Sequence, residues 1–575
     1  MEKQHNRGQD GAGIAAVKLN TEPGYPFLHR LRSGANQPIA DLFAQIGKEY
    51  DEVEKYQPDI KNHPGLMKGH LNFLGEVLLG HLRYGTQGKN NAEFCHPFIK
   101  RHTIPARNLA LAGNFNLVNT EELFGLVNID PGEFQRQSDL AAMMEVLYHF
   151  LVKADEAFPG EMDILKVLKK AVPLFDGGFN FSGILGNGDG FVMRDAHGIR
   201  PSYYYIHDDV IVAASERAAI RTAFHLEENE VQELMPGHAL IVKADGSYSI
   251  EQIVEPKERK ACSFERIYFS RGSDEKIYKE RKKLGYLLSD TVLKAIDYDL
   301  KNTIFSFIPN TAETAFYGLV KGAEAYLNKI KIDRILSWQK DFDEEKLTEM
   351  VSRRIRIEKI AIKDVKLRTF ITEDSSRNEM VQHVYDITYG TVRKNIDTLV
   401  VIDDSIVRGT TLKESIIRML SRLEPKKIIV VSSAPQIRYP DCYGIDMSKM
   451  GDFIAFRAAI DLLKDTGQQS ILTEMLDKCK ELQRNNQLHT ENVVRQLYKP
   501  FTPEDISAKI AQLITAPDIT IPVSVIYQTI ESLHEACPTN LGDWYFTGNY
   551  PTPGGNRVCN KAFMNYMEGK NVRGY

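Results

Sequence analysis

The sequence is short of cysteine, of long apolar runs and of net positive charge, and each shortage excludes a class of protein. Its 575 residues include six cysteines and no CxxC pair, which gives neither a disulfide framework nor a zinc site and favours a reducing, cytoplasmic location. No secretory signal pattern and no run of about 18 apolar residues is present, so no membrane span is expected. The formal net charge of −5 argues against a general surface for nucleic acid or anionic lipid.

The chain is too long for one hydrophobic core, so we expect about two to four domains. Residues 1–255 are rich in glycine and in short apolar alternations, as at Asp209–Ala214 and His238–Val242. This pattern predicts sheet packed on sheet with helices outside, an α+β arrangement. We assign residues 1–255 to a first domain.

From residue 256 the pattern changes to longer helical stretches between short apolar strands. The predicted strands are Ile304–Ile308, Leu399–Ile402 and Ile428–Ser432. Such alternation indicates an α/β domain with a parallel sheet, which we place at residues 256–465. Charges of both signs in Lys340–Glu358 favour a solvated helix. Residues 466–575 are expected to form a helical extension and tail.

The most informative segment is VVIDDSIVRGTTL, from Val400 to Leu412. Its first residues predict a buried parallel strand, so that Asp403 and Asp404 emerge at the carboxyl end, where open α/β sheets bind their ligands. An amphipathic helix follows, with Leu412, Ile416, Leu420 and Leu423 on one face. Small side chains, hydroxyls and backbone N–H groups before a helix suit a phosphate, and they come here from Ser405, Arg408, Gly409, Thr410 and Thr411.

This segment resembles the signature of type I phosphoribosyltransferases, and most of all that of the glutamine-dependent amidophosphoribosyltransferases. Those enzymes bind 5-phosphoribosyl-1-pyrophosphate (PRPP). The resemblance implies that Asp403 and Asp404 hold the ribose hydroxyls and help to bind Mg²⁺, and that the loop from Ser405 to Thr411 holds the 5′-phosphate.

Further segments resemble the same family in the same order. They are FERIYFSRGSDE from Phe264, FSFIPNTAETA from Phe305, KDVKLRTFI from Lys363 and SSAPQIRYPDCYGIDM from Ser432. By this resemblance Asn310 and Thr311 belong to a pyrophosphate loop, while Lys363, Arg368 and Thr369 meet the diphosphate from a closing loop. Substitution at the anomeric carbon releases pyrophosphate, so cations that neutralise the leaving group and a lid that excludes water suit the chemistry.

The N-terminal part contains NRGQDGAGI, GHLRYGTQG and LAGNFNLVN, from Asn6, Gly80 and Leu111. These segments resemble the glutaminase domain of class II amidotransferases, an αββα sandwich of the N-terminal-nucleophile type. The resemblance implies that Arg83 grips the carboxylate of glutamine and that Asp139 anchors its amino group. It also implies that Asn114 and the N–H of Phe115 form the oxyanion hole and that Arg7 steadies the nucleophile loop. A guanidinium fork fits a carboxylate, and N–H donors fit a developing oxyanion.

The sequence departs from that family in its nucleophile. The family uses a cysteine at the mature N-terminus, ahead of the RGQD motif, and no cysteine stands there. We expect a misassigned start or a truncated chain rather than a domain without glutaminase activity, since the later glutaminase positions survive. The missing stretch would also supply a core strand of the sandwich, leaving an unpaired edge.

Other departures concern single residues. Phe115 stands where the family has glycine and would be strained if the site needs a positive φ, and Asn6 stands where histidine is common. Some members carry an iron–sulfur cluster. The matching tail segment, GDWYFTGNYP, has no cysteine, Asp441 replaces another ligand, and Cys262 alone matches, so no cluster is expected.

The expected activity is amidophosphoribosyl transfer, in which PRPP, glutamine and water give 5-phosphoribosylamine, glutamate and pyrophosphate, the first step of purine synthesis. The resemblance further implies inhibition by purine nucleotides and a homotetramer. Two alternatives stay open, namely an enzyme that uses only ammonia and a non-catalytic PRPP-sensing regulator. Other class II amidotransferases, such as those that make asparagine or glucosamine, do not account for the segment around Asp403.

Overall fold

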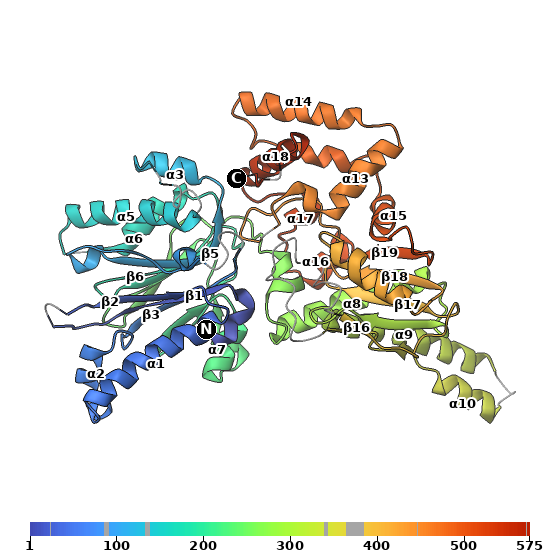
Figure 1. Cartoon of the computed structure of the whole chain (residues 1–575), viewed down its shortest axis with the longest axis horizontal. Helices are drawn as coiled ribbons and strands as arrows, with labels where there is room; N and C mark the ends of the chain where they lie inside the picture. The colour runs from blue at the N-terminus through green and yellow to red at the C-terminus, as the bar shows by residue number, and fades with distance from the viewer. Residues whose placement is uncertain are drawn as a thin grey trace.

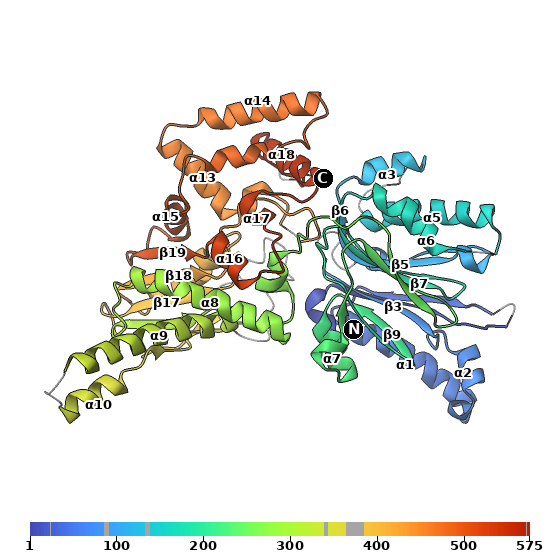
Figure 2. The same cartoon turned by 180° about the vertical axis from the view of Figure 1, so that it is seen from behind.

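The computed structural model describes residues 1–22, 25–85, 91–130, 132, 138–160, 162–338, 343–363, 385–445, 447–570 and 572–574. The chain forms two halves that lie beside each other, each built on its own sheets (Figure 1). Seen from behind, the C-terminal helices cap the second half and approach the first half near α3 (Figure 2). No described helix is both long enough and apolar enough to cross a membrane.

The first half contains one antiparallel sheet of six strands in the order β12-β11-β7-β6-β5-β4. The bounds of these strands are β4 (Phe98–Lys100), β5 (Leu109–Leu117), β6 (Gly177–Leu185), β7 (Gly190–Arg194), β11 (His238–Val242) and β12 (Tyr248–Gln252). This sheet carries the apolar alternation seen in the sequence. Leu109 and Leu111 of β5 pack toward helices, while Ala110 and Ala112 face the opposite layer.

Two three-stranded sheets form the opposite layer, β2-β1-β3 and β10-β8-β9. Their strands are β1 (Gly11–Val17), β2 (Leu28–Ser33), β3 (Val77–Arg83), β8 (Tyr203–His207), β9 (Val210–Ala214) and β10 (Gln232–Glu233). Within the described residues, β3 pairs only with β1, and β9 pairs only with β8. The two outer strands β3 and β9 both border the large cavity described below.

Helices cover the outer faces of these layers. Helices α5 (Asp139–Ala157) and α6 (Ile164–Ala171) pack on the six-stranded sheet, and α1 (Pro38–Tyr56) places Leu42 against Ala12 of β1. The shorter helices of this half are α2 (Pro64–His70), α3 (Thr120–Leu126) and α7 (Arg217–Phe224). The result is the αββα sandwich predicted from the sequence, which is thereby confirmed.

The second half is built on a five-stranded parallel sheet in the order β14-β13-β17-β18-β19. Its strands are β13 (Thr303–Phe307), β14 (Arg356–Ile357), β17 (Thr398–Asp403), β18 (Lys427–Ser432) and β19 (Val523–Tyr527). The parallel sheet confirms the predicted α/β class. Strand β19 was not predicted, since it lies in the segment interpreted as helical.

Alternate residues of the central strand point to opposite helical layers. Val400 and Ile402 pack with helices α8 (Glu275–Ala295) and α9 (Glu313–Ser337), while Leu399 and Val401 pack toward the C-terminal helices. Burial on both faces explains why this strand reads as one continuous apolar run.

The remaining helices lie mostly on the second face and above it (Figure 1). They are α12 (Ile417–Ser421), α13 (Ile454–Asp465), α14 (Ser470–Arg484), α15 (Pro503–Ile514), α16 (Ile530–Ala536), α17 (Trp544–Thr547) and α18 (Pro553–Met567). The charged segment predicted to be a solvated helix contains α10 (Glu344–Ser352), after which the chain enters β14. A β-ribbon of β15 (Ala361–Lys363) and β16 (Tyr385–Ile387) stands beside the sheet.

Helices α8 and α9 cross in direct backbone contact because two glycines meet there. A Cβ at Gly285 would lie 1.7 Å from the carbonyl oxygen of Ala315, and one at Gly318 would lie 1.8 Å from that of Lys282. Since no side chain fits at either position, the two helices form one tightly packed layer under the parallel sheet.

Candidate functional site

The paired aspartates lie at the carboxyl end of β17, as predicted. Asp403 Oδ1 accepts a hydrogen bond from the Asp404 backbone N–H (2.8 Å), and Asp404 Oδ1 accepts one from the Ser405 hydroxyl (2.9 Å). Burial and the neighbouring Asp404 charge raise the pKa of Asp403 well above its usual range. Burial raises the pKa of Asp404 to about 6, although Ser405 and the cation of Arg281 oppose the shift. Two carboxylates held this close favour a bound cation.

The loop after the aspartates has the shape expected of a phosphate site. Gly409 has a φ of +72°, which favours glycine, and a Cβ there would also lie 2.3 Å from Ile454 Cδ1, so the Ile454 side chain would have to move. Arg408 pairs with Asp452 at 2.9 Å at the edge of the loop. Helical backbone begins by Leu412, as the sequence predicted, and all the phosphate-loop residues named from the sequence line the cavity.

The segment predicted to be the pyrophosphate loop borders the same cavity as the predicted phosphate loop. Asn310 follows β13 through a cis Pro309–Asn310 peptide bond, and Asn310, Thr311 and Lys363 line the same cavity as the two aspartates. Lys363 ends β15, and its charge lowers the pKa of both aspartates against the stronger effect of burial. Arg368 and Thr369, also predicted to meet the diphosphate, lie outside the described residues.

The predicted glutamine-site residues are brought together in the first half. Arg83 ends β3, Asn114 and Phe115 lie in β5, and Asp139 begins α5, and all four line the cavity. Asp139 Oδ2 accepts a hydrogen bond from the Leu117 N–H (3.0 Å). Burial raises the pKa of Asp139 to about 6, opposed by that N–H and by the cation of Arg573 from the C-terminal tail. The site thus holds an arginine, an amide and a carboxylate, which are the groups that recognise an amino acid.

Phe115 does not adopt the strained backbone that the sequence raised as a concern. It lies in regular antiparallel pairing with Phe179 and has no positive φ. Its ring stacks on His96 at a centroid distance of 6.1 Å. A phenylalanine is therefore accommodated here as an ordinary strand residue.

No thiol faces the site in the described part of the chain. All six cysteines are buried, and no cysteine lines the cavity. Cys95, the nearest in sequence to Arg83, directs its Sγ to the carbonyl oxygen of Ser33 (3.5 Å), and burial raises its pKa. None of the described cysteines is placed to attack a glutamine amide.

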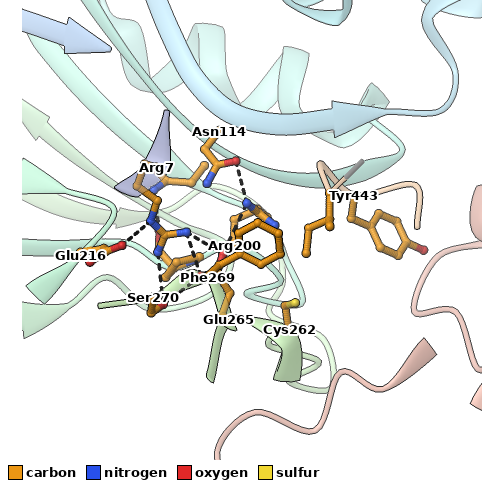
Figure 3. Close-up of polar contacts among 12 residues, drawn as sticks. Arg7, Asn114, Arg200, Glu216, Cys262, Glu265, Phe269, Ser270 and Tyr443 are labelled. Carbon is orange, nitrogen blue, oxygen red and sulfur yellow. Dashed lines mark hydrogen bonds and ion pairs between the residues drawn. The ribbon is translucent and has the colours of Figure 1, made fainter. Parts of the chain in front are cut away.

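Arg7 belongs to a buried polar network between the two halves (Figure 3). Its Nε pairs with Glu216 at 2.6 Å, and its Nη1 donates to both oxygens of Glu265 at 2.9 and 2.8 Å. Ser270 Oγ also donates to Glu265 (2.8 Å), and Arg200 Nη2 donates to Asn114 Oδ1 (2.8 Å). Sequence reasoning found Arg7 and Asn114 but missed the other members.

Another residue missed from the sequence is Arg281 of α8. It is 5% exposed and donates to the carbonyl oxygens of Arg266, Tyr268 and Ser270. Its charge lowers the pKa of Asp404. An arginine on the apolar face of a helix was the available signal, since such residues are rarely buried without a polar role.

The positions that match iron–sulfur ligands in some relatives are filled by a packed core. Trp544 Nε1 donates to Asp441 Oδ1 (2.9 Å), and the Tyr545 hydroxyl lies 3.2 Å from Cys262 Sγ. Both rings are fully buried, and burial raises the pKa of the Cys262 thiol to about 12. One thiol, one carboxylate and two rings do not fit a thiolate-bound cluster.

One cavity of about 2640 Å³ connects the two predicted sites. Its lining includes Asn114 and Asp139 of the first half together with Asn310, Asp403 and Asp404 of the second. Tyr268 and Phe269, near the start of the second half, line the cavity as well. A small molecule released at one site could therefore reach the other without crossing packed protein.

Comparison with known proteins agrees with this geometry. No family model matches the sequence. The amidophosphoribosyltransferase of Bacillus subtilis is 28% identical over 80% of each chain, and that of Pseudomonas aeruginosa is 28% identical over 68% of this chain and 73% of its own. The Escherichia coli amidophosphoribosyltransferase is 26% identical over 80% of each chain.

A solved structure has the same fold. The B. subtilis glutamine phosphoribosylpyrophosphate amidotransferase, complexed with ADP and GMP, superposes with a TM-score of 0.62 over 96% of this chain and 93% of its own, at 22% identity. The fold and the site define a class in which an N-terminal-nucleophile-type sandwich is joined to a type I phosphoribosyltransferase sheet. Within this class, the sequence comparisons point to one kind of enzyme. The curated proteins that the chain resembles over two thirds or more of its length are amidophosphoribosyltransferases.

Proposed function

We propose that the protein transfers ammonia derived from glutamine to PRPP, forming 5-phosphoribosylamine, glutamate and pyrophosphate. The observation that carries this proposal is one cavity whose lining includes Asn114 and Asp139 of the first half and Asp403 and Asp404 of the second. Ammonia and PRPP need a shared, enclosed space, because water competes with ammonia for the anomeric carbon. We also propose a domain boundary at about residue 255, with the glutamine reaction in the first domain and the PRPP reaction in the second.

On the PRPP side, the residues fit the parts of the substrate by charge and shape. Asp403 and Asp404 would hold the ribose hydroxyls, and the loop around Gly409 would hold the 5′-phosphate. Lys363, with Asn310 and Thr311, would stabilise the leaving pyrophosphate as negative charge develops on it. Arg368 and Thr369 are proposed to join Lys363 there.

The two aspartates also fit a magnesium ion. Mg²⁺ prefers oxygen ligands and commonly binds through one or two carboxylates together with substrate phosphates. Asp403 and Asp404 supply such oxygens, and a cation would stabilise the charged forms that burial disfavours in both residues and that the Asp404 charge further disfavours in Asp403. When bound, Mg²⁺ would neutralise charge on the leaving diphosphate.

On the glutamine side, Arg83 would bind the α-carboxylate and Asp139 the α-ammonium group. The Asn114 amide and the Phe115 N–H would stabilise the oxyanion formed when the glutamine amide is attacked. Among the described residues that line the cavity there is no cysteine to attack that amide. That observation favours a second candidate, an enzyme that aminates PRPP with ammonia alone.

A third candidate, a PRPP-sensing regulator, would need neither the pyrophosphate loop nor a glutamine site. We propose the enzyme because the described residues assigned to both line one cavity. Purine nucleotides as inhibitors, a homotetramer and a cytoplasmic location belong to the same proposal. The proposal that purine nucleotides bind this protein is supported by the ADP and GMP in the complex of the B. subtilis enzyme.

The test is PRPP-dependent pyrophosphate release with ammonia and, separately, with glutamine. It should be run on this chain and on a chain extended upstream to the first in-frame cysteine, with Asp403→Asn/Asp404→Asn as the inactive control. We expect release with ammonia from both chains and with glutamine from the extended one. Release from neither chain with either donor would exclude the enzyme and leave the sensor.

A further inference from the structure

Arg200 contacts the amide of Asn114 from outside the set of residues that the glutamine reaction is expected to use. It follows β7 in a tight turn, is 3% exposed, and donates from Nη2 to Asn114 Oδ1 over 2.8 Å (Figure 3). The two residues come from different parts of the sandwich, since Asn114 lies in β5 and Arg200 lies 86 positions later, after β7. This contact bears on the direction in which the Asn114 amide oxygen points.

A guanidinium group carries only hydrogen-bond donors, so the atom of Asn114 that faces Arg200 must be the amide oxygen. The Asn114 NH₂ group is thereby turned away from Arg200. Asn114 lines the cavity, and its NH₂ group donates to no acceptor among the described residues. An asparagine without such a neighbour could rotate by half a turn and present its oxygen to the site, which would repel an oxyanion.

Arg200 is itself held in place at both ends. Its backbone N–H and that of Ile199 point to the carboxylate of Asp195 (3.4 and 3.0 Å), and its carbonyl oxygen accepts from Arg194 Nε (2.8 Å). At the other end, Nη2 lies 3.4 Å from Glu265 Oε1. The backbone of Arg200 is thus held in place, and Glu265 provides a counter-charge for its guanidinium group.

The remaining polar atoms of Arg200 give it no other anchor. Its Nε and Nη1 are buried and have no hydrogen-bond partner among the described residues. Leaving two donors of a buried cation unmade is costly. Among the described residues, the guanidinium group is therefore held through Nη2, which contacts Asn114 and Glu265.

We propose that Arg200 is the positioning residue of the oxyanion hole, which it keeps in the productive state by fixing the orientation of the Asn114 amide. Glu265, which lies at the start of the second half and also binds Arg7, fixes Arg200 in turn. The oxyanion hole of the first half is thereby held by a carboxylate of the second half. This inference rests on the proposed glutaminase activity.

The test compares Arg200→Met, which keeps length but removes every donor, with Arg200→Lys, which keeps a charge and a donor. Both are made in the chain that releases pyrophosphate with glutamine in the preceding experiment. Loss of one oxyanion donor lowers kcat by about 100- to 1000-fold, and a donor that is present but misdirected should cost about 10- to 100-fold. We expect that loss in kcat with glutamine for Arg200→Met, an unchanged KM, and partial recovery in Arg200→Lys.

Ammonia-dependent release is the internal control, because it does not use the oxyanion hole. Arg107→Met is the matched variant, since Arg107 also forms a partly buried ion pair in the first half (with Asp155, 2.6 Å) but does not line the cavity. In the double variant Arg200→Met/Asn114→Ala, the Arg200 substitution should have no further effect, because the amide it orients is gone.

The outcomes separate this inference from the proposed function. Normal kcat with glutamine in Arg200→Met, or equal losses with glutamine and ammonia, would overturn the positioning role while leaving the enzyme in place. Additive losses in the double variant would overturn it as well. If no version of the chain uses glutamine, the glutaminase proposal fails and the assignment of Arg200 fails with it.

Discussion

Arg7 and Glu265 are 258 positions apart in the sequence, yet Arg7 Nη1 lies 2.9 and 2.8 Å from the two oxygens of the Glu265 carboxylate. Glu265 is 2% exposed. Burial acts to raise its pKa, but Arg7, Arg200 and Ser270 together lower that pKa to about 2. The carboxylate therefore stays charged while buried and joins the two halves of the chain.

Glu265→Gln should destabilise the protein, because it leaves two buried arginines without their shared counter-charge. We expect a loss of about 3 kcal/mol in the free energy of unfolding at pH 7. The folded pKa lies below the usual value of about 4.5, so the stabilisation is complete above pH 4.5 and disappears as the pH falls toward 2. Urea unfolding of parent and variant at pH 3, 5 and 7 measures this. Glu258→Gln, at a largely exposed ion pair, is the control, and a parent–variant gap independent of pH would contradict the prediction.

Asp404→Asn should stabilise the protein while abolishing its activity. The folded pKa of Asp404 is raised to about 6, so folding takes up a proton between about pH 4 and 6, and stability falls as the pH rises through that range. Removing the charge should add on the order of 2 kcal/mol at pH 7. Thermal unfolding with and without PRPP checks both parts. A lower Tm in the variant would contradict the prediction, because it would show that neighbouring groups stabilise the Asp404 carboxylate more than burial disfavours it.

Glutamine affinity should fall at acidic pH because of Asp139. Its pKa is raised to about 6, and only the carboxylate form attracts the ammonium group of the substrate. Below pH 6 we expect the Kd to rise about tenfold per pH unit, as measured by calorimetry between pH 5 and 8, a measurement that needs no turnover. Asp139→Asn should bind weakly with a flat profile. A flat profile in the parent would exclude Asp139 from binding the amino group.

Gly318→Ala should disrupt the contact between α8 and α9. A Cβ there would lie 1.8 Å from the carbonyl oxygen of Lys282, so the helices must move apart, at a cost of about 1 to 3 kcal/mol or more. Gly47→Ala in α1 is the matched control, because nothing lies within 4 Å of its added Cβ. In an exposed helix that change should stabilise by about 0.5 to 1 kcal/mol. Equal chemical-denaturation midpoints for the two variants would refute the close crossing.

The parts of the fold and site that sequence reasoning could predict are those with local patterns. The strand before Asp403 is apolar on both faces, and the loop after it carries glycine and hydroxyls before a helix, so a few adjacent residues specify the structure. Strand β19 had a similar signal in VSVIY, from Val523, which was masked by the helical character of the residues around it.

Contacts between residues far apart in the sequence have no local pattern from which they could be predicted. Arg200 and Glu265 act through partners 86 and 258 positions away, and nothing adjacent in the sequence distinguishes them from other charged residues. The same holds for Arg281, whose influence on Asp404 arises only when α8 packs under the sheet. The concern over Phe115 had a related origin, because the expected positive φ came from residue type, whereas β5 imposes an extended backbone.

The outer strands β3 and β9 also determine how the protein behaves in concentrated solution. Each presents one side without a strand partner in the described chain, and Leu78 of β3 is 57% exposed. Backbone groups on such a side can template pairing with another polypeptide. Hydrogen exchange should therefore be faster along the unpaired side of these two strands than in β1 and β8, which pair on both sides. Storage at high concentration would favour intermolecular sheet growth from the same place.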